Sequence, residues 1–129
     1  MSDAIERVIG DVERYSEAGE RLAARLLLQS QWNRDDIERL RSGVAIIESC
    51  RSTDSAARSR GLTQMLADFE QSRRSIQASV VLALLEDGTT IAEIGQVFGV
   101  SRQLANRLVK DAHNHYPERS PVHQPSPTS

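Results

Sequence analysis

Residues 90–110 read TIAEIGQVFGVSRQLANRLVK, and this stretch predicts two short helices joined by a tight turn. Thr90 and Glu93 have the spacing of a capping box, in which a hydroxyl and a carboxylate each bond a backbone amide at a helix start. Gly99 stands where the first helix has to end, because glycine readily adopts the left-handed backbone of a helix terminus. Ser101 is a favoured N-cap for the second helix. The fold of this segment is therefore predicted by the two residues that begin its helices, Thr90 and Ser101, and by the glycine of the turn between them.

The second helix separates apolar from polar side chains. Its inner side gathers small and apolar residues at 3.6 residues per turn, as packing against another helix requires: Leu104, Ala105, Leu108 and Ala112. Its outer side holds residues that can bond base edges or phosphates: Arg102, Gln103, Asn106, Arg107 and Lys110. This sorting predicts a helix that binds double-stranded DNA. The alternative is an ordinary solvated helix face.

The expected contacts differ along this helix. Arg102 and Gln103 lie in the first turn, which reaches deepest into the major groove in helices of this kind. Arginine suits the acceptors of guanine, whereas glutamine or asparagine suits adenine. Contacts to phosphate are expected from the later basic residues Arg107 and Lys110 and from Ser101 at the start of the second helix. The first helix could add contacts to the DNA backbone through Thr89, Thr90 and Gln96.

EIGQVFGVSR at residues 93–102, followed by a polar and basic helix, resembles the helix-turn-helix of bacterial transcription regulators. The likeness is closest to region 4 of sigma factors and to LuxR-type DNA-binding domains, and it covers residues 75–112. It implies a trihelical DNA-binding head with residues 101–112 as recognition helix. Gly95 stands where such motifs usually carry alanine. The sigma function is not implied, because residues 1–72 lack an aromatic-rich segment that could melt a promoter.

The composition favours an all-α fold. Aromatic residues make up only 4% of the chain, so the core has to be built from Leu, Ile, Val and Ala, which suits helix packing. All four prolines fall in the last thirteen residues, and the chain up to Tyr116 therefore lacks the strongest helix breaker. We expect an N-terminal helical hairpin or bundle, joined by a long helix to the C-terminal helix-turn-helix head.

The first helix carries a stripe of apolar residues at alternating three- and four-residue spacing: Ile5, Val8, Val12, Tyr15, Leu22 and Leu26. Such a stripe packs either within its own monomer or against a second copy, and both readings stay open. A connection is expected at residues 29–33. A second amphipathic helix follows with Ile37, Leu40, Val44 and Ile47, and short linkage favours an antiparallel hairpin.

A third, longer helix is expected from about Ala56 to Glu86, with a bend or break at Gly61 or within residues 71–75. The expected domains are a helical bundle at 1–72 for dimerisation or a partner, the DNA-binding head at 73–112, and a disordered tail at 113–129. The tail is rich in proline and serine and poor in apolar residues.

Charge and cysteine content limit the possible functions. The chain has a net charge of −2, which does not suit a protein that coats nucleic acid through many phosphate contacts. Cys50 is the only cysteine, so no intrachain disulfide is possible, and its place in the apolar pattern predicts a buried structural thiol. No apolar run approaches a membrane span, and the N-terminus lacks the layout of a signal peptide. We expect a cytoplasmic, nucleoid-associated protein.

Catalysis and metal binding have little support in the sequence. His113 and His115 lie two residues apart and point in different directions on a helix, and no cysteine or carboxylate set completes a metal site. No glycine-rich phosphate loop is present, and no nucleophile stands at a catalytic spacing from a base. We expect no metal, no cofactor and no enzymatic activity. The expected partners are double-stranded DNA and a second copy of the chain. The alternative is an interaction module whose sigma-like head contacts RNA polymerase or another regulator.

Overall fold

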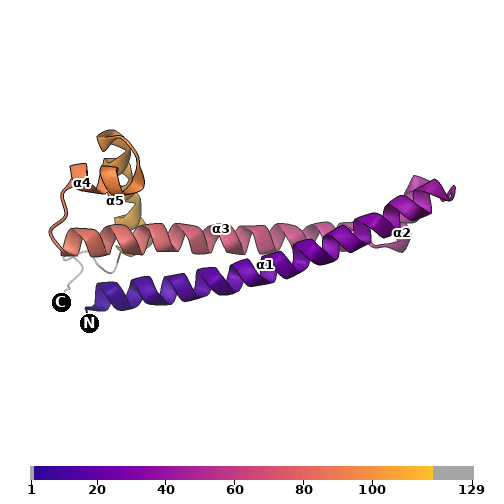
Figure 1. Ribbon diagram of the computed structural model, residues 1–129, viewed down its shortest axis with the longest axis horizontal. Helices are drawn as coiled ribbons and strands as arrows, with labels where there is room; N and C mark the ends of the chain where they lie inside the picture. The colour runs from indigo at the N-terminus through magenta and orange to yellow at the C-terminus, as the bar shows by residue number, and fades with distance from the viewer. Residues whose placement is uncertain (1, 118–129) are drawn as a thin grey trace, which may run out of the picture. The chain divides into compact units, whose positions relative to one another are not determined.

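The computed structural model describes residues 2–117, in which five α-helices and no strands occur (Figure 1). The helices are α1 (Asp3–Arg41), α2 (Ile46–Ser52), α3 (Ser55–Glu86), α4 (Ile91–Phe98) and α5 (Arg102–His115). The expected all-α class is thereby confirmed. Within this part of the chain, no helix combines the length and the apolar character that crossing a membrane requires.

Helix α1 is a single helix of 39 residues, so the connection expected at residues 29–33 and the separate helix from Ile37 are wrong. Residues 29–33 are mostly polar but contain neither glycine nor proline, so nothing in them breaks the helix. A side-chain hydrogen bond also spans this segment. Gln29 Nε2 donates to Asn33 Oδ1 at 3.3 Å, one turn further on. The chain turns only after Arg41, where Gly43 adopts a φ of +99°.

Helix α3 runs without interruption through Gly61 and residues 71–75, where a bend was expected. Gly61 lies where the Arg25 side chain of α1 approaches α3 closely, and it does not break the helix. A Cβ at this position would lie 2.7 Å from Nη1 of Arg25, so a side chain here would displace that guanidinium. Cys50, on α2, is exposed, which overturns the expectation of a buried thiol.

The chain divides into two compact units, and one of them is Tyr15–Gln71. In it, α1 and α3 run in opposite directions, since Tyr15 stacks on Phe69 with ring centroids 4.9 Å apart while Arg25 donates to the Arg58 carbonyl at 2.6 Å. Polar side chains take part in this contact beside apolar ones. The Arg25 and Arg58 guanidinium carbons lie 5.0 and 4.2 Å from the centre of the Trp32 ring.

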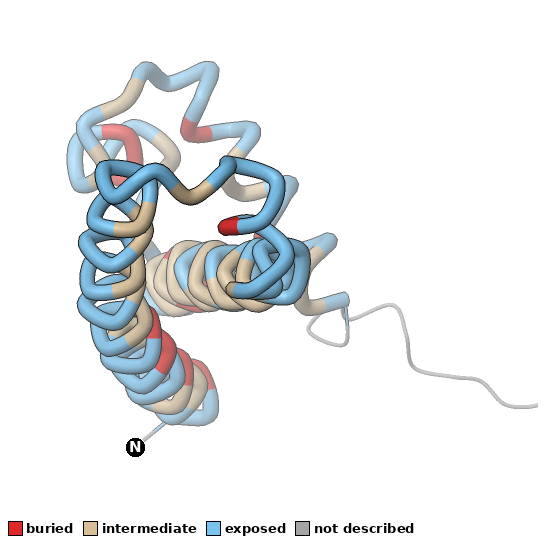
Figure 2. The backbone as a smooth tube through the Cα atoms, turned by 90° about the vertical axis from the view of Figure 1, so that its right-hand side faces the viewer, coloured by how far each residue is buried: buried red, intermediate tan, exposed pale blue. Residues whose placement is uncertain are grey.

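This unit buries little apolar surface by itself. Among residues 15–71, the buried apolar residues are Ala18 and Leu22, which are four residues apart on α1. Figure 2 shows that the exposed positions of the backbone far outnumber the buried ones. Eight large apolar residues are exposed: Leu26, Leu27, Leu28, Ile37, Leu40, Ile46, Ile47 and Leu66. Covering one such side chain is worth on the order of 1–3 kcal/mol, so the exposed set is large relative to the stability of a small unit.

The other unit takes in the chain up to Arg14 and from Ser72 onward, so it joins the first turns of α1 to α4 and α5. Its core contains Ala78, Val81, Leu82 and Ala112. Five further residues pack around this core: Leu85, Phe98, Leu108, Val109 and Tyr116. The core thus holds the last turns of α3 against α5, and it fixes which side of α5 is left to solvent.

Candidate nucleic-acid interface

Helix α4 begins at the predicted capping box. Oγ1 of Thr90 accepts a hydrogen bond from the Glu93 amide at 3.2 Å, and the Thr90 amide donates to Oε1 of Glu93 at 2.9 Å. The Thr90 hydroxyl lies 3.1 Å from the same carboxylate oxygen. These bonds from the backbone amide and the hydroxyl lower the pKa of Glu93. The start of α4 is therefore fixed by local hydrogen bonds.

The turn after α4 has the left-handed geometry that the sequence predicted. Gly99 adopts φ +67° and ψ +35°, and the Val100 amide then donates to the Gly95 carbonyl at 2.8 Å. Gly95 is buried where the two helices approach closely. A Cβ on Gly95 would lie 3.0 Å from the Val100 carbonyl oxygen and 3.7 Å from Cβ of Ala105. Small residues at this point allow α4 to pack directly against α5.

Helix α5 begins at Ser101, whose Oγ accepts from the Leu104 amide at 3.1 Å. Ala105 and Ala112 are fully buried and Leu108 is half-buried, so three of the four predicted inner residues face the core. Leu104 differs, because 37% of its surface is exposed. The inner side of α5 is centred on its small residues, with Leu104 at its edge.

Thr89 is half-buried, and the other predicted DNA-facing residues are exposed: Thr90, Gln96, Ser101, Arg102, Gln103, Asn106, Arg107 and Lys110. At helical spacing Gln103, Arg107 and Lys110 lie opposite Ala105, Asn106 lies beside them, and Arg102 stands at the edge of this side. The two N-cap hydroxyls differ in what they can offer. Thr90 is engaged with Glu93 through both its acceptor and its hydroxyl hydrogen, whereas Ser101 only accepts and can still donate to a phosphate oxygen.

Helix α5 continues to His115, past its expected end at Ala112. Residues 113–115, assigned from the sequence to a disordered tail, are therefore helical, and they lengthen the polar side of α5 by His113 and Asn114, which are exposed. Residues 118–129 of the expected tail lie outside the described part of the chain. The sequence signal for this extension is the absence of proline before Pro117.

The end of α5 is held by a cluster that sequence reasoning missed. The Tyr116 hydroxyl donates to Oδ2 of Asp11 at 2.7 Å, and Asp11 is almost fully buried and also paired with Arg14. The guanidinium carbon of Arg7 lies 4.3 Å from the centre of the Tyr116 ring. Burial and then the bond to Asp11 raise the pKa of Tyr116.

A second contact of the same cluster joins α5 to α3. Nε2 of His115 lies 3.0 Å from Oγ of Ser75, and the His115 ring meets the Tyr116 ring edge-on with centroids 4.7 Å apart. Helix α5 is thus tied to α1 and to α3 at its last turn. Its first turn, where base contacts are expected, is placed by the Gly95 crossing and the Ser101 cap.

Within residues 2–117, no three His, Cys, Asp or Glu side chains lie close enough together to hold a metal ion. Comparison of the chain with protein-family models, characterised proteins and solved structures gives no match. The site therefore has to be interpreted from its own geometry and chemistry.

Proposed function

We propose that the protein is a sequence-specific transcriptional regulator that binds double-stranded DNA. In this proposal α4, the turn at Gly99 and α5 act as a helix-turn-helix, the end of α3 completes a trihelical head, and α5 enters the major groove. The observation that carries the proposal is the outward side of α5. Its basic and amide side chains are all exposed, and no carboxylate occurs from Arg102 to Lys110.

Electrostatics supports sequence reading over general coating of DNA. The net charge of the chain is −2, so long-range attraction to phosphate is weak. Basic charge on α5 comes from Arg102, Arg107 and Lys110, of which Arg107 and Lys110 can position the helix on the backbone. Gln103 and Asn106 each carry a side-chain amide, and such an amide can form two hydrogen bonds to one adenine. The surface therefore favours a short recognition site read by few contacts.

We further propose that the protein acts as a homodimer in the cytoplasm, bound to two half-sites at the nucleoid. The apolar stripe of α1 supports this. Its residues Ile5, Val12 and Leu26 are each more than 40% exposed in the single chain, whereas Leu22 is buried. A second copy packed beside α1 would cover part of this stripe, as the requirement to bury large apolar surface favours.

The experiment that tests DNA recognition is a binding-site selection from randomised duplexes with the full-length protein. We expect a defined motif to be enriched. A variant with Arg102→Ala and Gln103→Ala should enrich a different or weaker motif, because each bidentate contact is worth about 1–3 kcal/mol of discrimination. The matched control carries Arg51→Ala and Arg60→Ala, exposed arginines of α2 and α3. No enrichment by the wild type, or an unchanged motif in the first variant, would refute the assignment.

A protein-interaction module is the second candidate, and one observation favours it. Val97 on α4 is 62% exposed, an apolar side chain on the same head as the polar side of α5. Salt dependence separates the two functions. Binding to duplex DNA weakens steeply as salt rises because counterions are released, whereas an apolar contact to RNA polymerase or another regulator would not follow that slope.

A further inference from the structure

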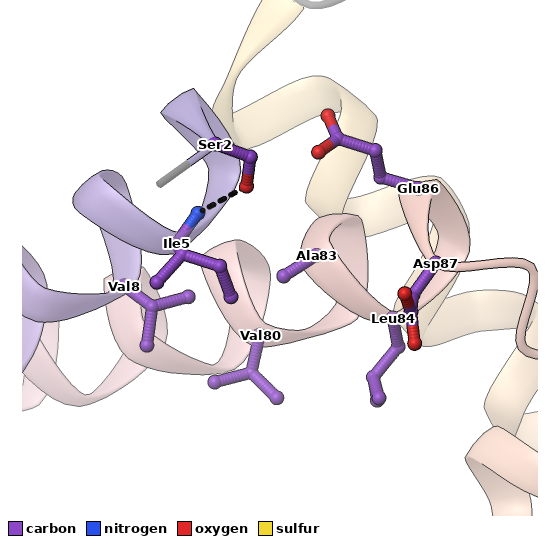
Figure 3. A pocket seen from close by; sticks show the side chains of 8 residues that line it. All are labelled: Ser2, Ile5, Val8, Val80, Ala83, Leu84, Glu86 and Asp87. Carbon is purple, nitrogen blue, oxygen red and sulfur yellow. Dashed lines mark hydrogen bonds between the residues drawn. The ribbon is translucent and has the colours of Figure 1, made fainter.

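An open apolar groove lies between the start of α1 and the end of α3, in the unit that also contains α4 and α5. Its volume is about 450 Å³. Ile5 and Val8 line it from α1, and Val80 and Leu84 line it from α3. Figure 3 shows these four side chains extending to the same side of the two helices. Nothing in residues 2–117 fills this side, so the groove is available to a partner.

The α3 wall of the groove has a charge pattern that is symmetric about Val80. Residues separated by three, four or seven positions share a helix face, and Arg73, Val80, Leu84 and Asp87 have this spacing. Arg73 and Asp87 are exposed and stand seven residues to either side of Val80. Asp87 still follows the helical path, because its amide donates to the Ala83 carbonyl at 3.1 Å.

The apolar residues of this wall share the same centre. Ile76 and Leu84 each lie four residues from Val80, and both are half-buried in the single chain. Reversing the direction of the helix about Val80 therefore places the acid Asp87 where the base Arg73 stood. It also places Leu84 where Ile76 stood, so an apolar residue replaces an apolar residue. A surface of this kind is complementary to a second copy of itself in antiparallel orientation, as a twofold axis requires.

We propose that two copies of the chain dimerise through this stripe, with their α3 helices antiparallel and the twofold axis at Val80. Val80 of one copy faces Val80 of the other, Leu84 faces Ile76, and Asp87 pairs with Arg73. The Ile5 and Val8 wall of α1 covers the flank of the incoming helix. The inference rests on the proposed homodimer but not on DNA binding, and it places the interface on α3 beside the first turns of α1.

Charge selects a second copy over an unrelated helix. Glu86 and Asp87 close one end of the groove with negative charge, and Arg73 supplies positive charge at the other end of the same stripe. An unrelated partner would need only one matching end. The internal symmetry of the stripe is required only when the surface meets itself, because an isologous contact uses each residue twice.

Crosslinking of the full-length protein tests the axis directly. Cys50 is the sole cysteine, so Cys50→Ser gives a background without thiols. In that background we expect Val80→Cys to form a disulfide-linked dimer under mild oxidation, since a residue on a twofold axis meets its own copy. The matched control is Val97→Cys, an exposed valine on α4, which should remain monomeric on a non-reducing gel.

Charge reversal tests the pairing at the ends. In sedimentation without DNA, Arg73→Asp or Asp87→Arg alone should weaken dimerisation about tenfold, because two symmetry-related pairs become repulsive and each is worth a factor of a few. The double variant should recover most of the wild-type affinity. Circular dichroism confirms that the single variants stay helical.

Each result supports or overturns the inference. A dimer that crosslinks at Val80 and recovers in the double variant supports it. A dimer that neither crosslinks at Val80 nor responds to charge reversal uses another surface, such as Leu26 and Ile37, and overturns the placement. A protein that is monomeric at tens of micromolar overturns the inference together with the proposed homodimer. All these measurements omit DNA, so a failure of DNA recognition would be seen separately.

Discussion

The phenolic hydroxyl of Tyr116 and the carboxylate of Asp11 are joined by a 2.7 Å hydrogen bond across 105 residues of sequence. Asp11 is 1% exposed, and a buried carboxylate is tolerated only when hydrogen bonds and an opposite charge compensate for its lost hydration. Arg14 supplies the charge and Tyr116 supplies a hydrogen bond. Tyr116, which ends α5, therefore also helps to stabilise the buried carboxylate of Asp11 on α1.

Tyr116→Phe should destabilise the protein by ~1–3 kcal/mol, because the aromatic ring is kept while a buried carboxylate loses a donor. Thermal or urea unfolding measures this change. Tyr15→Phe is the matched control, since Tyr15 packs by stacking on Phe69 and phenylalanine retains that contact. Equal losses in the two variants would show that the bond to Asp11 contributes no stability of its own.

The same tyrosine should make the protein sensitive to alkali. Its pKa in the folded protein is raised above the ordinary value of 10.0, because burial disfavours the phenolate and Asp11 stabilises the protonated form. The unfolded chain therefore ionises first, and the stability that is fully present below pH 10 is lost as the pH rises through the folded-state pKa. We expect the free energy of unfolding to fall above pH 10 in the wild type and to fall less in Tyr116→Phe. Parallel pH profiles for the two proteins would contradict this.

Gly99 is constrained by its backbone and not by its surroundings. Its φ is +67°, and an added Cβ would meet no atom within 4 Å. Gly99→Val should therefore be destabilising by ~1–3 kcal/mol, because β-branched residues rarely adopt a positive φ. Gly99→Asn should be milder, since asparagine tolerates this region. The comparison is made by thermal melting, and a valine variant that melts like the wild type would exclude the observed turn.

Gly95 is constrained in the opposite way, by the Val100 carbonyl and by Ala105. Gly95→Val should be destabilising by ~1–3 kcal/mol, because its side chain has to push α5 away from α4. Ala92→Val is the matched control on the exposed side of the same helix and should change stability by only a few tenths of a kcal/mol. Denaturant unfolding of both variants checks the difference. Equal effects would show that α4 and α5 do not pack closely at Gly95.

Local signals in the sequence predicted local structure well. The Thr90 cap, the left-handed Gly99 and the Ser101 cap are as expected, because each depends on residues within one turn of helix. The end of α1 was not predicted, because the apolar spacing on which the prediction relied does not stop there. Val44 and Ile47 continue the apolar spacing beyond Gly43, so the spacing concealed the residue at which the helix ends.

Features that depend on distant residues could not be read from the sequence. Trp32 in the polar segment of α1 is held between Arg25 and Arg58, and neither periodicity nor capping rules indicate that contact. The same holds for Tyr116, which stands beside a proline at the start of a tail-like composition and yet packs against the core. Of the candidate DNA-facing side, the residues of α5 were predicted from the sequence, whereas the contacts of its last turn with Asp11 and Ser75 were not.

Base reading and phosphate binding should be carried out by different residues of α5. Gln103 lies in the first turn and Lys110 two turns later, and both are exposed. Gln103→Ala should relax the preference at one or two base pairs of the selected site, at a cost of ~1–3 kcal/mol for the preferred sequence. Lys110→Ala should weaken binding to all duplexes alike and reduce the slope of log K against log salt by about 0.9, because one phosphate contact is lost. Titrations of matched and mismatched duplexes at several salt concentrations measure both effects. If the two variants show the same loss on every duplex with an unchanged salt slope, α5 does not lie in the major groove as we propose.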